Sequence, residues 1–365
     1  PPDTVLPNNL TSLTFGNRFN QLIMPGALPS SLEQLTFGSA YNQLIELGLF
    51  HEGLTSLEFG SSFDQEIPVG GLPVSLRSLT FGMMFNRSIY LQVLPPALTY
   101  LALGDTYNHT FTPDQLPESI ATLKVGRASI QPNAFPRSLT SLSYGLSVTF
   151  TQHFPKGFLP PTLLSLSIGF NYYYPLPPGS LPDSLTELRF LSGMDQPNDN
   201  VTLPANLTKL SLLSTHQCKY IQDHPHSIDH VTIVGSHDMD YPGDKAWMTK
   251  PVRLMTLTVY ADHHRDKALS KELVLLLRRL YVNYPAVETF EIFVQDTNNH
   301  NMMLIKCRMI DVVKKRVVYT VRELEQTPSS PSSSSLDKPV LHLGFISLNT
   351  GSSITKQFLS FVRRF

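Results

Sequence analysis

A phrase of 22 residues recurs along the first part of this chain. The stretch "LPNNLTSLTFGNRFNQLIMP" begins at Leu6, and "LPSSLEQLTFGSAYNQLIEL" begins at Leu28. A fixed period with leucine at fixed offsets is typical of a solenoid, in which each coil packs only against its neighbours. We call the first Leu of each "LxxLxF" pattern the anchor of its unit. The predicted anchors are Leu10, Leu32, Leu54, Leu76, Leu98, Ile120, Leu139, Leu163, Leu185, Leu207, Ile228 and Leu254, with a candidate thirteenth at Val287.

Each column of the repeat has a physical role. The alternation Leu35–Thr36–Phe37 predicts one short strand per coil, and stacked coils then form a parallel sheet. A glycine follows the strand, where we expect the chain to turn without a side chain. Three positions before nearly every anchor stands a proline, which cannot continue a helix into the strand. The return path should therefore be extended or 3₁₀ rather than α-helical.

An aromatic residue and an amide follow the anchor at nine and ten positions. We expect the rings to stack as a core column. The amide side chains should be buried and should bond turn backbone in their own and adjacent coils. The predicted polar ladder consists of Asn20, Asn42, Asp64, Asn86 and Asn108.

The unit "LPxSLxxLxFGxxFNQxI", clearest at residues 28–45 and at 72–89 ("LPVSLRSLTFGMMFNRSI"), resembles the FNIP repeat of the leucine-rich-repeat superfamily. The resemblance implies a curved solenoid that is used for protein–protein contact. In some members of this family an F-box-like segment precedes the repeats, which implies a role as a ubiquitin-ligase adaptor. No such segment is visible in this sequence, so the adaptor role is an analogy.

Composition excludes several classes of function. Charged residues are 16% of the 365, and the formal net charge is −1, so no global field favours nucleic acid or an anionic membrane. Residues 1–200 hold 8 Lys and Arg against 14 Asp and Glu, whereas residues 201–365 hold 20 against 15. The chain has two cysteines and no apolar run long enough to span a bilayer. These features favour a cytoplasmic protein.

Residues two and four places past each anchor should face outward from the sheet, on the concave side of the solenoid. Most of them are Ser or Thr, which suits a strand surface. The charged and aromatic side chains among the others, together with one histidine, could recognise a protein partner, because partners usually dock on a concave face and interfaces favour such residues. These candidates are Glu58, Tyr100, Lys124, Glu187, Arg189, Lys209 and His230.

Two other functions are considered. Seven of the twelve histidines lie between His216 and His264, which suggests a zinc site or a hydrolase. The candidate metal ligands are His216, Cys218, His224 and His226. Their spacing matches no standard zinc motif, and no catalytic motif supports an enzyme. Regular Thr columns could also order water in an ice-binding solenoid, but the charged exceptions interrupt them. We therefore expect a noncatalytic chain without cofactors, whose oligomeric state the sequence does not indicate.

The pattern changes after about residue 262. The predicted architecture is an α/β-type repeat solenoid over residues 1–262, with a mostly non-helical convex side. A C-terminal α/β cap should shield its last coil. We expect a helix at 266–283, a strand at 287–294 and a hairpin up to residue 326. A low-complexity linker at 327–339 should lead to a strand and a short basic helix in residues 340–365.

Overall fold

The computed structural model forms two compact units, Pro1–Asn206 and Leu207–Phe365. The residues that the structure describes are 6–145, 153–169, 172, 174, 176–190, 202–213, 217, 221, 228–233, 252–261, 286–296, 302–311, 316–324 and 341–347.

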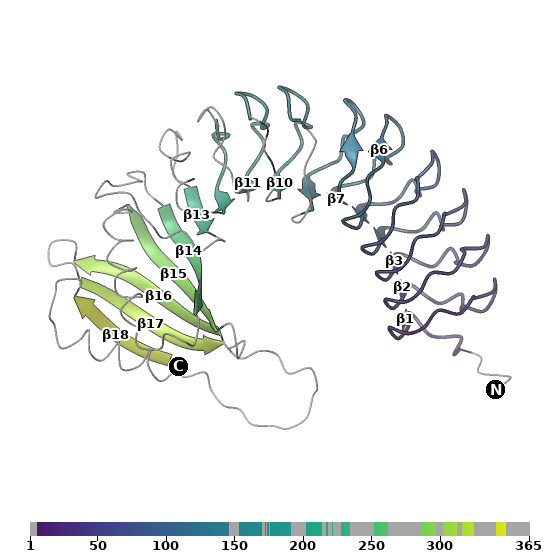
Figure 1. Ribbon diagram of the computed structural model, residues 1–365, viewed down its shortest axis with the longest axis horizontal. Coiled ribbons are helices and arrows are strands. Elements are labelled where there is room, and N and C mark those ends of the chain that lie inside the picture. The colour runs from purple at the N-terminus through teal and green to yellow at the C-terminus, as the bar shows by residue number, and fades with distance from the viewer. Residues whose placement is uncertain are drawn as a thin grey trace. The chain divides into compact units, whose positions relative to one another are not determined.

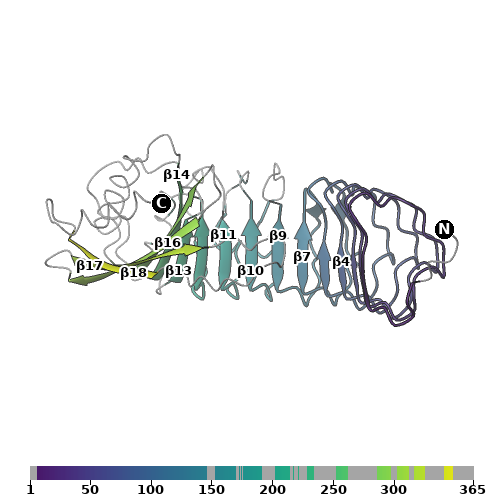
Figure 2. The ribbon, with the colours of Figure 1, turned by 90° about the horizontal axis from the view of Figure 1, so that it is seen from below.

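The first unit is a stack of coils with one short strand each (Figure 1). All neighbouring strands of its sheet run parallel, and Figure 2 shows β7, β9, β10 and β11 side by side and pointing the same way. Their order follows the chain, so each coil packs on the next one in sequence. The strands are β1 (Ser12–Thr14), β2 (Gln34–Thr36), β3 (Ser56–Glu58), β4 (Ser78–Thr80), β5 (Tyr100–Ala102), β7 (Thr122–Val125), β9 (Ser141–Tyr144), β10 (Ser165–Ile168) and β11 (Glu187–Phe190).

The register of the sheet repeats the register of the sequence. Leu13 of β1 lies beside Leu35 of β2, which lies beside Leu57 of β3. Leu35 and Leu57 are buried, while the residues before and after them face outward, as strand alternation requires. The predicted parallel sheet with one rung per coil is confirmed.

Two ladders of stacked rings fill the interior of the first coils. The predicted column nine places past the anchor is present: Tyr41, Phe63 and Phe85 stack with ring centroids about 6 Å apart. A second ladder comes from the residue directly after each of the first four strands, and the ring centroids of Phe37 and Phe59 in it are 5.5 Å apart. Within one coil the two ladders touch at 3.9 Å between ring centroids. Each inner ring is therefore packed against aromatic rings on several sides, an arrangement that contributes beyond area burial alone.

The glycine after each strand has a different role from the one that we expected. Gly38, Gly60 and Gly82 do not have the positive φ of a tight turn. Instead, a Cβ added at Gly60 would lie 2.0 Å from the carbonyl oxygen of Gly38 in the preceding coil. Glycine is required there because neighbouring backbones approach too closely for any side chain.

A second position, which the sequence analysis did not single out, does require positive φ. It lies in the return path and is occupied by glycine in several coils, including Gly26, Gly48 and Gly70. The next coils place Gln92 and Asp114 there, with φ of 67° and 69°.

The proline three places before the anchor begins a tight turn that leads into the strand. The amide of Leu32 donates to the carbonyl of Pro29, and the other proline-bearing coils of this part repeat the bond. His51 is the exception to the proline column, yet the amide of Leu54 donates to its carbonyl in the same way. Its ring Nε2 also lies 2.8 Å from the carbonyl oxygen of Leu28, one coil earlier. The turn therefore survives the loss of proline.

The return path of the first unit contains no helix in its described residues. Two coils pair there through β6 (Thr110–Phe111) and β8 (Ser129–Ile130), which form a small parallel sheet. The predicted non-helical convex side is confirmed for this part of the chain.

The second unit continues with longer strands and then changes direction. β12 to β15 are parallel, and β15 to β18 are antiparallel. The predicted thirteenth rung, hairpin and late strand are all present. The predicted helix at 266–283, the linker at 327–339 and the final helix lie outside the described residues. The strands are β12 (Lys209–Leu212), β13 (Ile228–Ile233), β14 (Val252–Ala261), β15 (Val287–Asp296), β16 (Met302–Asp311), β17 (Arg316–Leu324) and β18 (Leu341–Ser347).

One anchor was placed wrongly by the sequence analysis. Ile228 pairs with Val252, and His230 pairs with Leu254, so the twelfth anchor is Val252 and not Leu254. The error arose because Pro251 was taken as the proline three places before the anchor, whereas the strand begins directly after it. The shift is two residues, and it moves Leu254 from the predicted inward anchor position to the row of His230. No described segment forms a helix with the length and apolarity needed to cross a membrane.

Candidate functional site

The seven predicted partner-binding residues all lie on strands. The structure places Glu58 on β3, Tyr100 on β5, Lys124 on β7, Glu187 and Arg189 on β11, Lys209 on β12 and His230 on β13. Those of the first unit face outward from the sheet, and Glu58, Lys124 and Arg189 are exposed. In Figure 1 the strands of this unit line the inner side of its curve. The first unit therefore holds five of the seven candidates on one face, and the second unit holds the other two.

Tyr100 and Lys124 form a pair on this face. Their strands are neighbours, and the Lys124 ammonium lies 5.4 Å from the centre of the Tyr100 ring. A cation over an aromatic face at this distance gains about 0.5–1 kcal/mol at an exposed site.

Glu187 and Arg189 lie two residues apart on β11 and share the outward face. A strip of four serines separates them from Lys124, because β9 and β10 lie between β7 and β11. The strip consists of Ser141, Ser143, Ser165 and Ser167. The face of the first unit thus has two groups of distinctive side chains with small hydroxyls between them.

In the second unit, His230 belongs to a hydrogen-bonded cluster. Its Nε2 lies 2.8 Å from the Thr256 hydroxyl and 3.4 Å from the Thr232 hydroxyl. Burial lowers the pKa of His230, Glu291 opposes that change, and Lys209 adds to it. Glu291 also forms an ion pair with Lys306. Half-buried and bonded to threonine, His230 contributes packing and hydrogen bonding to this sheet.

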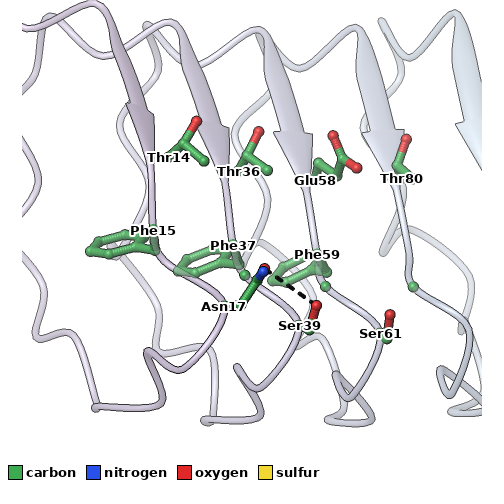
Figure 3. A pocket seen from close by; sticks show the side chains of 13 residues that line it. Thr14, Phe15, Asn17, Thr36, Phe37, Ser39, Glu58, Phe59, Ser61 and Thr80 are labelled. Atoms are coloured by element: carbon green, nitrogen blue, oxygen red, sulfur yellow. Dashed lines mark hydrogen bonds between the residues drawn. The ribbon is translucent and has the colours of Figure 1, made fainter. Parts of the chain in front are cut away.

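A groove crosses the first four coils at the carboxyl ends of their strands, with a volume of about 330 Å³. One rim is the outward row Thr14, Thr36, Glu58 and Thr80, and Figure 3 shows these four side chains in line. The other rim is the turn row Asn17, Ser39 and Ser61, where the Ser39 hydroxyl donates to Asn17 Oδ1 at 3.4 Å. The glycines described above, including Gly38, Gly60 and Gly82, lie in the lining. The groove was not predicted from the sequence. The sequence does contain a signal for it, because the glycine column has the same 22-residue period as the outward row.

The predicted polar ladder runs along the other side of the aromatic stack. The amide of Asn42 donates to Asn20 Oδ1 at 2.9 Å, and the amide of Asp64 donates to Asn42 Oδ1 at the same distance. The rungs of Asn86 and Asn108 repeat this bond. The expected burial was wrong, because Asn20 and Asn108 are exposed and the other three side chains are half-buried. At the surface, water can satisfy the remaining donors and acceptors of these side chains.

Replacing Asn20 by alanine should lower the free energy of unfolding by about 1 kcal/mol, the net value of a partly solvated hydrogen bond. The change removes the acceptor for the Asn42 amide and for the Gln43 side chain, both at 2.9 Å. Asn20→Asp keeps an oxygen acceptor, and Asp64 already fills the same role in the array. Urea denaturation would measure both variants. Equal losses for the two would contradict an acceptor role.

The candidate metal ligands cannot be placed, because His216, Cys218, His224 and His226 lie outside the described residues. Among the residues that are described, no group of three or more His, Cys, Asp or Glu side chains could hold a metal ion. Cys307 is a free thiol in β16, and burial raises its pKa well above the usual value.

Comparison with known families agrees with this geometry. The model of the FNIP repeat matches residues 2–40, 41–83, 85–127 and 150–193. The coils in these four segments match the FNIP repeat. The matched segments include β1 to β7, β10 and β11, while β8 and β9 lie in the gap between the third and fourth segments. No curated protein matches the sequence significantly.

A solved structure resembles the FNIP array. It is the crystal structure of CroV588, described as a novel circular LRR protein, with a TM-score of 0.56 and 31% sequence identity. The match covers 70% of this chain and 37% of that protein, so this chain spans well under half of the length of its structural relative. The likeness supports the leucine-rich-repeat type of solenoid that the strand register shows.

Proposed function

We propose that this chain is a noncatalytic protein-interaction module, which binds a protein partner on the outward face of the first unit's sheet. The observation that supports this most is the spacing of distinctive side chains on that face. Tyr100 and Lys124 form one group, Glu187 and Arg189 form another, and only serines stand between them. A partner could contact both groups without steric hindrance from the strip between.

The packing behind this face suits such a role. Leu101, Leu123 and Leu188, which alternate with the outward residues, are at most 1% exposed. The backbone of a strand has little freedom to move when the inward side chains of that strand are fully packed. The outward groups are therefore held in a preorganised arrangement, which reduces the entropy that binding would otherwise cost.

The FNIP-type repeats and the similarity to a circular LRR protein are consistent with a binding protein rather than an enzyme. The greater length of that relative is compatible with this array acting as the recognition part of a larger protein. A substrate-selecting role in ubiquitin ligation belongs to the same proposal, and it would require the bound partner to be ubiquitinated.

The test compares two variants with the same change in net charge. The sheet variant carries Tyr100→Ala, Lys124→Ser, Glu187→Ser and Arg189→Ser. The control variant carries Tyr90→Ala, Arg127→Ser, Glu66→Ser and Arg137→Ser, which are exposed positions outside the sheet. Proteins captured from source-cell lysate by the native chain would be purified, and their Kd for each variant would be measured by calorimetry.

We expect binding to weaken at least about tenfold in the sheet variant, because aromatic and arginine anchors contribute most to interfaces. The control variant should bind like the native chain. Circular dichroism must show that both variants are folded. A captured partner that binds the sheet variant with native affinity would contradict this location.

A further inference from the structure

We infer that the groove at Glu58 receives an arginine side chain of a protein partner. The inference rests on the proposed function, since it names a chemical feature of the partner and where that feature binds. Glu58 is the only charged residue among those that line the groove. Its side chain is exposed, and no described lysine or arginine pairs with it.

The charge of the surroundings favours a cation. Residues 1–200 carry an excess of acidic over basic side chains, and the lining of the groove contains no Lys, Arg or His. The ion pair between Arg87 and Asp64 involves a residue of the polar ladder, and neither of the two lines the groove. A carboxylate on a concave surface without a neighbouring cation attracts a positively charged ligand.

The shape of the acceptor set favours guanidinium over ammonium. Hydroxyls stand on both rims, from Thr36 and Thr80 beside Glu58 and from Ser39 and Ser61 on the other rim, and Figure 3 shows these two rows with the rings of Phe15, Phe37 and Phe59 drawn between them. Guanidinium has five N–H donors in a planar fork, so it can engage a carboxylate and several hydroxyls together. Ammonium is a compact charge with three donors and would leave one rim unpaired.

Other ligand classes fit the groove less well. A carbohydrate needs an exposed ring to stack on, but Phe37 and Phe59 in the lining are each only 2% exposed, and the third lining ring, Phe15 of the first coil, is half-buried. A single carboxylate with neutral hydroxyls is also a poor set of ligands for Ca²⁺ or Mg²⁺, which prefer several carboxylate and carbonyl oxygens. An anion would be repelled by Glu58.

The groove also has a defined end. The turn position that holds Asn17, Ser39 and Ser61 is occupied in the next coil by Met83, whose side chain is 57% exposed. The hydroxyl rim therefore stops at the fourth coil, and the lining stops with Thr80 and Gly82. A ligand that needs polar contacts on both rims is confined to the coils around Glu58.

Nuclear magnetic resonance with a defined probe would test this inference without any natural partner. The probe is the capped peptide acetyl-Ala-Ala-Arg-Ala-Ala-amide, and its counterpart carries citrulline, which has the same shape without the charge. Each peptide would be titrated into the ¹⁵N-labelled full chain up to its solubility limit. We expect saturable shifts of the amides of Thr36, Ser39, Glu58 and Ser61 with the arginine peptide alone.

Two variants complete the test. Glu58→Gln should weaken binding of the arginine peptide about tenfold or more, because charge-assisted hydrogen bonds are lost. Glu66→Gln makes the same charge change at an exposed position of the same coil outside the groove, and it should bind like the native chain. The inference is overturned if no saturable shifts occur, if citrulline binds equally, or if the two variants weaken binding alike. Such a failure would leave the capture experiment on the sheet variant unaffected, so the two proposals fail separately.

Discussion

Replacing Phe63 by alanine should lower the free energy of unfolding by about 4 kcal/mol, as expected for a large aromatic side chain lost from a core. The ring is completely buried, and it stacks on Phe59 within its own coil and on Tyr41 and Phe85 in the adjacent coils. Its removal leaves a cavity that interrupts the ladder in the middle of the array. Because each coil is stabilised by its neighbours, the loss affects three coils together. Urea denaturation followed by circular dichroism would measure it.

Phe19→Ala is the matched control for this prediction. Phe19 occupies the same column in the first coil, where its ring is half-exposed and has a stacked neighbour from only one adjacent coil. Its removal should cost about 2 kcal/mol, because less apolar surface is buried there. Losses of equal size at both positions would show that the ladder does not stabilise the array through contacts between coils.

Replacing Gly60 by alanine should cost about 3 kcal/mol, because overpacking against rigid backbone cannot be relieved by a rotamer change. The new Cβ would lie 2.0 Å from the carbonyl oxygen and 2.5 Å from the carbonyl carbon of Gly38. The coils would have to separate locally, which would also strain the strand hydrogen bonds beside them. The melting temperature and the free energy of unfolding should both fall.

Gly16→Ala provides the control within the same column. No atom lies within 4 Å of a Cβ at Gly16, and its φ is not positive. The free energy of unfolding should therefore stay the same or rise by up to ~1 kcal/mol, since alanine restricts the unfolded chain. If Gly16→Ala and Gly60→Ala were equally destabilising, close approach between coils would not be the reason for the column.

The same close approach shapes the candidate binding surface. Because the backbones of neighbouring coils touch at the glycine column, no side chain can cover the groove between the two polar rims. The groove next to Glu58 is therefore a consequence of how the coils pack. A variant such as Gly60→Ala should disturb both the stability of the array and the binding of the arginine peptide.

Much of the fold follows from the sequence alone. The 22-residue spacing specified one strand per coil, and strand alternation identified Leu35 as inward and Thr36 as outward. The aromatic column was also predictable, because rings at a fixed offset in each of the first five coils lie next to one another when the coils stack. The seven outward candidates lie on strands for the same reason, although their role in binding remains a proposal.

Other features were decided by the tertiary structure. The exposure of Asn20 and Asn108 and the register of Val252 depend on how one coil lies on the next, which no single coil specifies. The glycine column was visible, but its cause, a backbone contact with the preceding coil, appears only in three dimensions. Periodicity thus determined which residues point inward and which point outward. The close approach of stacked backbones decided where the surface has no side chains and can hold a ligand. That approach depends on two coils at once, so no single unit of the sequence specifies it.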